Sequence, residues 1–270
     1  MTPSQGTAPS PAEAALRALA THGEIRAAIN LGNSVLAQKA HLTGDLAGVS
    51  VELAKALAVR LGVAVQLVEY TAAGQVVEAL KAGSWDLAFL AVDPARSVDI
   101  VFTPPYVLIE GAYLVRDASP ITVPADVDSR GIRVATGAGS AYDLFLVRTL
   151  KHATIERSST AREALELMAQ EERDVAAGVR AVLERFALQH GGLRLLQPSF
   201  MVIEQAIAIP RSAVHAEGAA RYLTEFIEEM KRNGFVADAL AASGQSDTAV
   251  APAATGPAPA SPTWRASSKA

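Results

Sequence analysis

Short apolar runs rich in β-branched residues alternate with longer stretches of helical periodicity along most of this chain. The clearest run, residues 86–92, is almost continuous in apolar side chains and shows no inside-out alternation. Such a run indicates a strand buried on both faces, as in a parallel sheet covered by helices on each side. The alternation of the two patterns therefore predicts an α/β fold with largely parallel sheets.

The elements fall into two similar sets. The first set has strands at 25–31, 63–70 and 86–92 and helices at 48–61 and 75–81. The second set has strands at 132–135, 174–178 and 193–196 and helices at 141–150, 161–170 and 180–190. Extended segments at 107–115 and 201–209 separate the sets, and a long helix is predicted at 213–232. We expect two lobes joined by two crossings, with lobe 1 at 24–108 and 204–242 and lobe 2 at 109–203.

The two ends of the chain differ from the rest. Residues 1–23 are expected to form a partly disordered leader that carries a short amphipathic helix at 12–20. Residues 243–270 consist almost wholly of Ala, Pro, Ser, Thr and Gly, so we expect a disordered tail. We recognise no secretory signal at the start, and no stretch approaches the roughly 20 apolar residues of a membrane span.

The composition excludes several kinds of chemistry. The chain has no cysteine, so it has no thiolate zinc site, disulfide, thiol nucleophile or cysteine-ligated iron–sulfur cluster. A net charge of −4 without basic runs argues against nucleic-acid binding. The five histidines have no metal-ligand spacing, so we expect neither a metal nor another cofactor. A small molecule is the expected partner.

Four short sequence motifs follow one another along the chain. A helix opens with Gly48-Val49-Ser50-Val51-Glu52-Leu53, the buried strand runs into Asp93-Pro94-Ala95-Arg96, and Val101-Phe102-Thr103-Pro104-Pro105-Tyr106 precedes the first crossing. Gly131-Ile132-Arg133-Val134-Ala135 then leads to Gly139-Ser140 at a helix start. With these motifs the chain resembles the bacterial extracellular solute-binding proteins of the polar amino-acid uptake class, which serve ABC transporters.

This resemblance implies a fold, a partner and a location. The fold is two doubly wound α/β lobes joined by two hinge strands, as in type II periplasmic binding proteins, and the lobes close on a ligand. The partner is an ABC permease, the location is the periplasm, and no catalytic activity is implied. Because no signal was recognised, a cytoplasmic location stays open as the alternative.

The resemblance also points to Arg96, whose counterpart in the family pairs with a ligand carboxylate. A planar guanidinium grips two oxygens at once, although a solvated loop arginine would have the same sequence. Leu90 and Ala91, just before this turn, are expected to border the ligand. Asn30 and Asn33 follow the first strand and are candidate hydrogen-bond donors.

A helix start supplies the second group of candidates. Gly139, Ser140 and Ala141 open the helix at 141–150, where free backbone N–H groups and the helix dipole favour an anion. Ser140 has an ordinary alternative role as a helix N-cap. Tyr106 and Tyr142 are the remaining aromatic candidates.

The family's usual partner for a ligand ammonium is missing. Relatives place an aspartate about five residues after the strand-opening aspartate, and counting from Asp174 reaches Val179. An unpaired ammonium is costly to bury, and Arg180 adds positive charge at this place. The expected ligand is therefore a carboxylate or dicarboxylate, unless Arg180 only caps a helix and faces outward.

Glu110 and Glu204 lie in the two crossings among apolar residues. They are candidates to bind a ligand amine or to bridge to Arg96 or Arg180, with solvation at the hinge as the plain alternative. The main functional hypothesis is capture of a small carboxylate-bearing solute, either amino-acid-like or an organic acid, by hinge closure. A cyclohexadienyl or arogenate dehydratase, with one of these glutamates as general acid, and a stand-alone cytoplasmic sensor are the alternatives.

Overall fold

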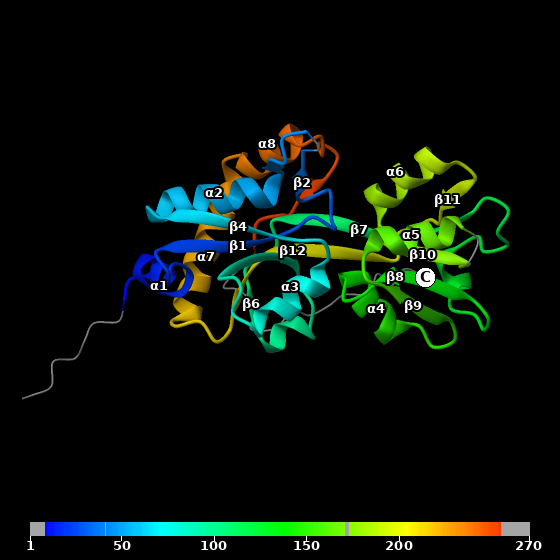
Figure 1. Cartoon of the computed structure of the whole chain (residues 1–270), viewed down its shortest axis with the longest axis horizontal. Helices are drawn as coiled ribbons and strands as arrows, with labels where there is room; N and C mark the ends of the chain where they lie inside the picture. Colours follow the sequence, from blue (N-terminus) through cyan, green and yellow to red (C-terminus); the bar gives the residue numbers. More distant parts are fainter. Residues whose placement is uncertain (1–8, 41, 171–172, 255–270) are drawn as a thin grey trace, which may run out of the picture.

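The structure is a computed structural model that describes residues 9–40, 42–170 and 173–254. Two groups of helices and strands lie end to end along an elongated molecule (Figure 1). The helices are α1 (Pro11–Leu19), α2 (Val49–Leu61), α3 (Ala73–Leu80), α4 (Ala141–Thr149), α5 (Ala161–Ala169), α6 (Arg180–His190), α7 (Ala216–Arg232) and α8 (Phe235–Ala242). The main strands are β1 (Glu24–Asn30), β4 (Ala64–Tyr70), β5 (Leu87–Ala91), β7 (Val107–Arg116), β8 (Arg133–Gly137), β9 (Thr154–Ser158), β10 (Val175–Val179) and β12 (Met201–Pro210).

The main strands form a sheet of order β4-β1-β5-β12-β7-β10-β8-β9. At one end β1 is parallel to β4 and β5, and at the other β8 is parallel to β9 and β10. The two central strands, β12 and β7, run antiparallel to each other and to their outer neighbours. The predicted α/β fold with parallel strand groups is confirmed.

Lobe 1 contains β1, β4 and β5 with α1, α2, α3, α7 and α8, and lobe 2 contains β8, β9 and β10 with α4, α5 and α6. Only the long strands β7 and β12 run between the two groups among the labelled elements of Figure 1. The two predicted crossings are confirmed by these strands. The predicted lobe boundaries after residues 108 and 203 fall inside β7 and β12 and stay predictions.

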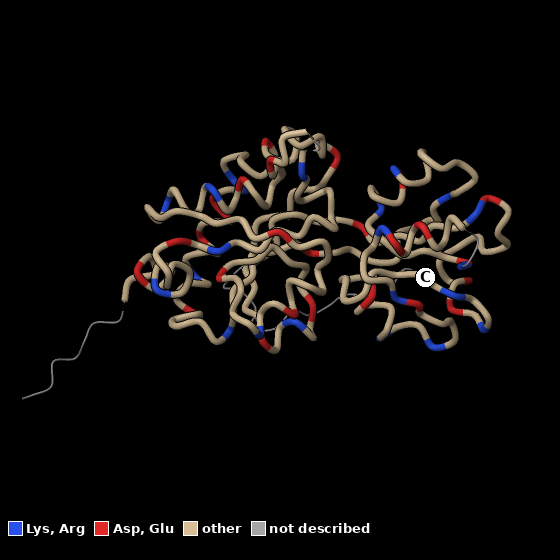
Figure 2. The backbone as a smooth tube through the Cα atoms, viewed as in Figure 1, with Lys and Arg blue, Asp and Glu red and all other residues tan. Residues whose placement is uncertain are grey.

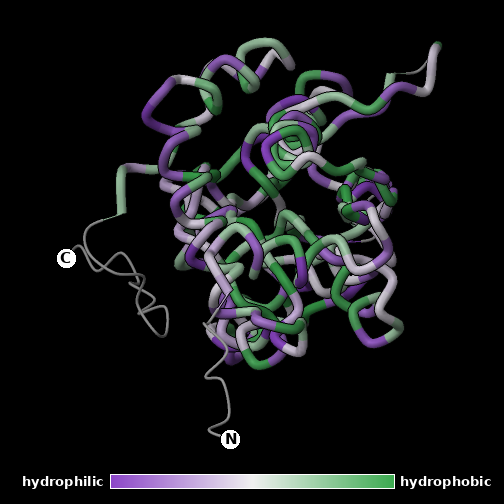
Figure 3. Tube along the Cα trace, turned by 90° about the vertical axis from the view of Figure 1, so that its left-hand side faces the viewer, coloured by the Kyte–Doolittle hydropathy of each residue, from purple (hydrophilic) through white to green (hydrophobic). Residues whose placement is uncertain are grey.

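The buried strands contribute many of the residues of the hydrophobic core. All five residues of β5 are buried, as its continuous apolar sequence predicts for a strand covered on both faces. Lobe 1 adds Trp85, whose indole N–H donates to the Val76 carbonyl at 2.8 Å. Seen from the lobe 1 end, hydrophobic and hydrophilic positions alternate along the peripheral helices (Figure 3). In α7, for example, Phe226 is buried in the core and its neighbour Glu225 is exposed.

Several short elements were not predicted. They are β2 (Gln38–Lys39), β3 (Leu46–Ala47), β6 (Ile100–Phe102), and the two 3-10 turns η1 (Arg96–Val98) and η2 (Pro124–Val127). In contrast, β11 (Leu193–Leu195) confirms the strand predicted at 193–196. The edge strand β9 was missed because its sequence, Thr-Ile-Glu-Arg-Ser, exposes polar residues. No helix within the described ranges is both long and apolar enough to cross a bilayer.

The leader helix is part of lobe 1. Ser10 caps α1, and Glu13 reaches back to the Ser10 backbone N–H, which completes a capping box. On the opposite side of the helix, Ala15 and Leu19 are fully buried in the main core. The predicted short helix is thus confirmed, and its apolar face packs on α7. Residues 1–8 of the leader lie outside the described residues.

The expectation of a disordered tail is wrong for residues 243–254. The short strand β13 (Ala249–Val250) pairs antiparallel with β7, and the Ala251 N–H donates to the Tyr106 carbonyl at 3.0 Å. Lys231 also donates to the Pro252 carbonyl at 2.9 Å. Backbone hydrogen bonds hold this segment, which its small-residue composition does not reveal. The remainder of the predicted tail, 255–270, lies outside the described residues.

The packing of α1 yields a stability prediction. Leu19→Ala removes a fully buried side chain and leaves a cavity, so the free energy of unfolding should fall by about 2–5 kcal/mol. Leu42→Ala is the matched control because Leu42 is 95% exposed, and its effect should stay within about 0.5 kcal/mol. Urea denaturation of both variants measures the difference. Equal effects would show that α1 does not contribute to the core.

Candidate functional site

A cavity of about 60 Å³ lies between the two lobes. Lobe 1 contributes the carboxyl ends of β1 and β5 and the start of α3, and lobe 2 contributes the carboxyl ends of β8 and β10 and the start of α4. The hinge strand β12 supplies Ile203 and Gln205. Ligands of doubly wound sheets bind at this edge, where strands end and helices begin.

The lobes touch directly around this cavity. The Arg96 Nη2 of lobe 1 donates to the Gly139 carbonyl of lobe 2 at 2.8 Å. A Cβ on Gly74, in α3, would lie 2.8 Å from the Ala138 carbonyl oxygen across the boundary. Arg185 on α6 also donates to the Ser34 hydroxyl at 3.3 Å. These contacts define a closed arrangement of the two lobes.

Arg96 is the charged centre of the cavity. Its side chain is buried, with the residue 4% exposed, and lines the cavity. Nη1 donates to the Ala91 carbonyl at 2.9 Å and Nη2 to Gly139, whereas the buried Nε has no hydrogen-bond partner. Burial lowers the pKa of Arg96 to about 10, so it is still a cation at neutral pH. A buried donor of a charged group is therefore unsatisfied.

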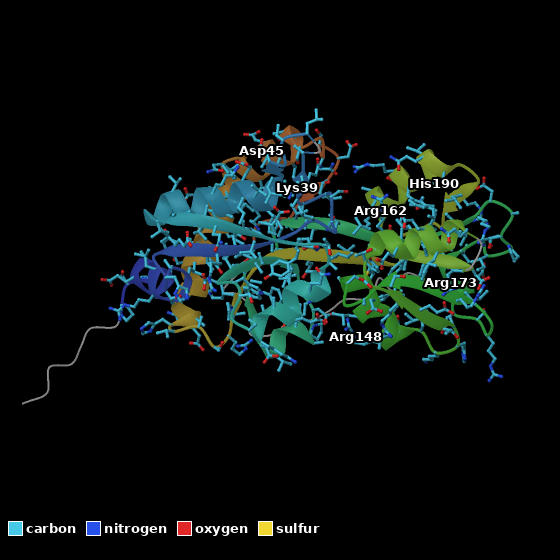
Figure 4. All side chains as sticks on the ribbon, in the orientation of Figure 1. Lys39, Asp45, Arg148, Arg162, Arg173 and His190 are labelled. Carbon is cyan, nitrogen blue, oxygen red and sulfur yellow. The ribbon has the colours of Figure 1, made fainter. Side chains whose placement is uncertain are left out.

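The nearest negative charge is already engaged. Asp93, three residues before Arg96, is buried and raises the Arg96 pKa against the effect of burial. However, its Oδ2 accepts from Arg148 on α4 at 2.8 Å. Figure 4 labels Arg148 beside α4, on the lobe 2 side of the contact. Within the described residues Arg96 forms no salt bridge of its own, because Asp93 pairs across the boundary instead.

The start of α4 is capped from within the chain. The Ser140 hydroxyl accepts from the Asp143 N–H at 3.1 Å, and the Gly139 N–H donates to Asp143 Oδ2 at 3.0 Å. Arg157 pairs with the same carboxylate at 2.8 Å. Gly139 therefore hydrogen-bonds to Arg96 and Asp143 but does not line the cavity. Ser140 and Ala141 do line it.

Seven predicted site residues are brought together around the cavity. They are Asn30, Asn33, Leu90, Ala91, Arg96, Ser140 and Ala141. The side-chain carbonyls of Asn30 and Asn33 accept from the Gly32 and Val35 N–H groups, which holds the two asparagines in place. Their roles in binding stay predictions.

Glu110 and Arg180, both candidates for ligand binding, lie outside the cavity lining, and of the alternatives left open for Glu110 the structure shows the bridge to Arg180. They form a salt bridge with each other, and the Ser199 hydroxyl donates to Glu110 at 2.6 Å. The Ser199 and Arg180 hydrogen bonds lower the Glu110 pKa and keep the carboxylate ionised. Arg180 also donates to Gln197 at 3.1 Å. The pair thus satisfies its charges between the first half of β7 and the start of α6 rather than in the cavity.

Glu204 is also outside the lining. It is exposed on β12, while its neighbours Ile203 and Gln205 are buried and face the cavity. Successive side chains of a strand point to opposite faces, so only one of two adjacent polar residues can face the ligand side. The sequence interpretation chose Glu204, whereas the structure places Gln205 at the cavity.

The sequence interpretation missed other lining residues as well. Thr71, Ala72 and Ala73 come from the turn into α3, and Phe89 comes from β5. Tyr142 lines the cavity and is buried, which raises its pKa to about 12 and keeps the phenol protonated. Tyr106 instead packs in the core with its hydroxyl 3.2 Å from Ser50.

The cavity is cationic although the chain is not. Arg96 is the one charged residue in the lining among the described residues, and the other polar side chains there are neutral. Figure 2 shows acidic and basic positions intermixed over both lobes, so the positive charge of the cavity is local. The described ranges contain no cluster of three or more metal-ligating side chains. The arrangement suits an anion of small size with an apolar body.

Because Gly74 lies close to Ala138 across the lobe boundary, its replacement is predicted to hinder closure of the lobes without lowering stability. In Gly74→Ala the added Cβ would strike the Ala138 carbonyl only when the lobes are closed, at a cost of roughly 1–3 kcal/mol. Small-angle scattering should show a larger radius of gyration. Thermal stability should not fall, because alanine favours the helix.

A second glycine provides the control for this variant. A Cβ on Gly218 would lie 2.8 Å from Ala14 Cβ, far from the cavity lining. Gly218→Ala should lower thermal stability and leave the radius of gyration unchanged. An unchanged radius in Gly74→Ala would contradict closure at this contact.

The fold matches known proteins. A putative binding component of an ABC transporter from Wolinella succinogenes, complexed with lysine, has a TM-score of 0.69 at 22% identity and covers 81% of this chain and 94% of its own. An amino acid ABC transporter substrate-binding protein from Streptococcus pneumoniae, bound to L-arginine, has a TM-score of 0.72 at 18% identity, covering 90% and 100%.

A third solved structure concerns the enzymatic alternative. It is an ancestral amino acid-binding protein described as a precursor of cyclohexadienyl dehydratase, with a TM-score of 0.67 at 22% identity, covering 82% of this chain and 94% of its own. At such identities the similarity establishes the fold alone. No curated protein sequence matches the chain.

The family is established by the sequence itself. Residues 37–242, most of the chain, match the family described as bacterial extracellular solute-binding proteins, family 3. The match spans the two hinge strands and every cavity-lining residue except Asn30, Gly32 and Asn33. The chain therefore belongs to the bacterial extracellular solute-binding proteins, family 3, and has the type II periplasmic-binding-protein fold.

Proposed function

We propose that this protein captures a small carboxylate-bearing ligand between its two lobes and delivers it to an ABC permease. The buried guanidinium of Arg96 is the observation that carries the proposal, because Arg96 lines the cavity and its Nε has no hydrogen-bond partner in the described part of the chain. A carboxylate would accept from Nε and offset the desolvated charge. Membership of an extracellular family supports export to the periplasm or cell surface.

The ligand that fits this cavity has no free ammonium group. Acidic side chains are absent from the lining among the described residues, and Val179 lines the cavity where the resemblance implies an aspartate. An ammonium held beside Arg96 would face a like charge and lack a counterion, which costs several kcal/mol. A carboxylic acid without an amino group is therefore favoured over the lysine and arginine bound to the solved relatives.

The contacts that Arg96 and the cavity lining make with both lobes also couple ligand binding to closure of the lobes. Arg96 belongs to lobe 1 but donates to Gly139 of lobe 2, and the cavity lining draws on both lobes. A ligand shifts the balance between open and closed states only by its differential contacts with the closed state. A carboxylate that binds Arg96 while touching Ser140 and Ala141 makes such contacts.

The dehydratase alternative is less well supported. It requires a general acid at the ligand, and both candidate glutamates lie outside the cavity lining. Tyr142, with its pKa raised to about 12, is a hydrogen-bond donor but a poor proton source at neutral pH. We therefore favour binding without chemical conversion.

Replacement of Arg96 tests the proposal directly. Arg96→Met keeps an apolar side chain of similar length but removes the fork of donors, so carboxylate affinity should fall by at least about 30-fold. Calorimetric titration with the best acid found in a thermal-shift screen measures the loss. Arg180→Met is the matched control, because Arg180 lies outside the lining, and its affinity should stay near that of the wild type. Equal affinities in wild type and Arg96→Met would contradict the proposed anchor.

The pH dependence of binding is a second test. Below about pH 4 a ligand carboxylate takes up a proton and loses its attraction to Arg96. Above about pH 10 Arg96 loses its proton in the unliganded protein, so binding requires proton uptake and affinity falls. Between about pH 6 and 9 the affinity should be constant. A titration step in that window would indicate a histidine or carboxylate at the ligand.

A further inference from the structure

Gln205 occupies a fixed position at the base of the cavity. It lies where β12 changes partners, since it pairs with Ala91 of β5 on one side and Val107 of β7 on the other. Its carbonyl accepts from the Tyr106 N–H at 2.8 Å. Strand pairing on both edges holds the backbone, so the side chain projects into the cavity from a rigid platform.

The side-chain amide of Gln205 has no partner in the described part of the chain. The residue is 5% exposed and lines the cavity, yet no hydrogen bond involves its Oε1 or Nε2. By contrast, Asn30 and Asn33 use their side-chain carbonyls in local hydrogen bonds. The amide donors and acceptor of Gln205 are therefore free at the cavity. A ligand that fills the cavity displaces water from this amide and is expected to supply its hydrogen-bond partner.

Gln205 and Arg96 converge on the same strand end. Arg96 Nη1 donates to the carbonyl of Ala91, the residue paired with Gln205 in the sheet. The cavity thus offers a cation and a neutral amide beside the end of β5. The amide both donates and accepts, so it suits an oxygen substituent near the carboxylate.

We propose that Gln205 is a specificity-determining residue that hydrogen-bonds a hydroxyl or carbonyl oxygen on the carboxylate ligand. This inference rests on the proposed function and adds the substrate class, namely hydroxy or oxo acids. A hydroxyl satisfies the amide without adding charge next to Arg96, whereas an ammonium adds like charge. A plain carboxylic acid displaces water from the amide without replacing its hydrogen bond and is rejected for that reason.

Matched acids that differ by one hydroxyl test the inference. The pairs are lactate and propionate, glycolate and acetate, malate and succinate, and phenyllactate and phenylpropionate, titrated calorimetrically into the full chain. For the pair that binds best, the wild type should prefer the hydroxy acid by about tenfold. Gln205→Leu should abolish that preference by weakening the hydroxy acid and leaving the plain acid unchanged.

Two further variants guard against a merely structural effect. Gln205→Glu is nearly isosteric and supplies an anion, so the affinity for alanine relative to lactate should rise at least about tenfold over the wild type. Glu204→Gln changes the opposite face of β12 and should leave the preference intact. Thermal unfolding of each variant confirms that the fold is retained.

The outcomes separate the two proposals. A wild type that binds plain and hydroxy acids equally, or a preference that persists in Gln205→Leu, overturns the role of Gln205 while the carboxylate site stands. An unchanged alanine-to-lactate ratio in Gln205→Glu overturns it as well. Failure of the wild type to bind any of these acids overturns the proposed function together with this inference.

Discussion

The guanidinium of Arg96 donates to the Ala91 carbonyl within lobe 1 and to the Gly139 carbonyl of lobe 2, while its Nε is buried without a partner. A desolvated cation of this kind is costly unless an anion compensates it. Asp93, the nearest carboxylate, is held by Arg148 across the same boundary. In the closed arrangement the Arg96 cation at the cavity therefore has no salt-bridge partner among the described residues.

The structure around Arg96 restricts which ligands can bind there. The hinge strands β7 and β12 carry the lobes, and Gly74 permits the backbones to approach within contact distance of Ala138. The lining is otherwise neutral or apolar in the described residues, so an ammonium has no counterion there. Gln205 adds an unpaired amide at the point where β12 exchanges β7 for β5. Charge, size and one neutral hydrogen-bonding group together define the ligand proposed for the site.

Much of the fold could be predicted because it depends on periodicity. The continuous apolar run of β5 indicated burial on both faces, and the extended segments at β7 and β12 indicated two crossings. Edge strand β9 and the added strand β13 were missed, since their polar or small residues carry no burial signal and their order comes from backbone hydrogen bonds. Within the site, Arg96 was predicted from the family resemblance and Asn30 and Asn33 from their places after the first strand, and all three line the cavity.

The sequence by itself determined two βαβ-type halves, the crossings between them, the absence of cysteine chemistry and the position of an arginine after a buried strand. It did not determine which of Glu204 and Gln205 faces the ligand, because a one-residue change in strand register exchanges the two faces. Nor did it determine that Glu110 pairs with Arg180. Those outcomes depend on which side chains the folded sheet brings together over long separations in the chain, and only the tertiary structure decides that.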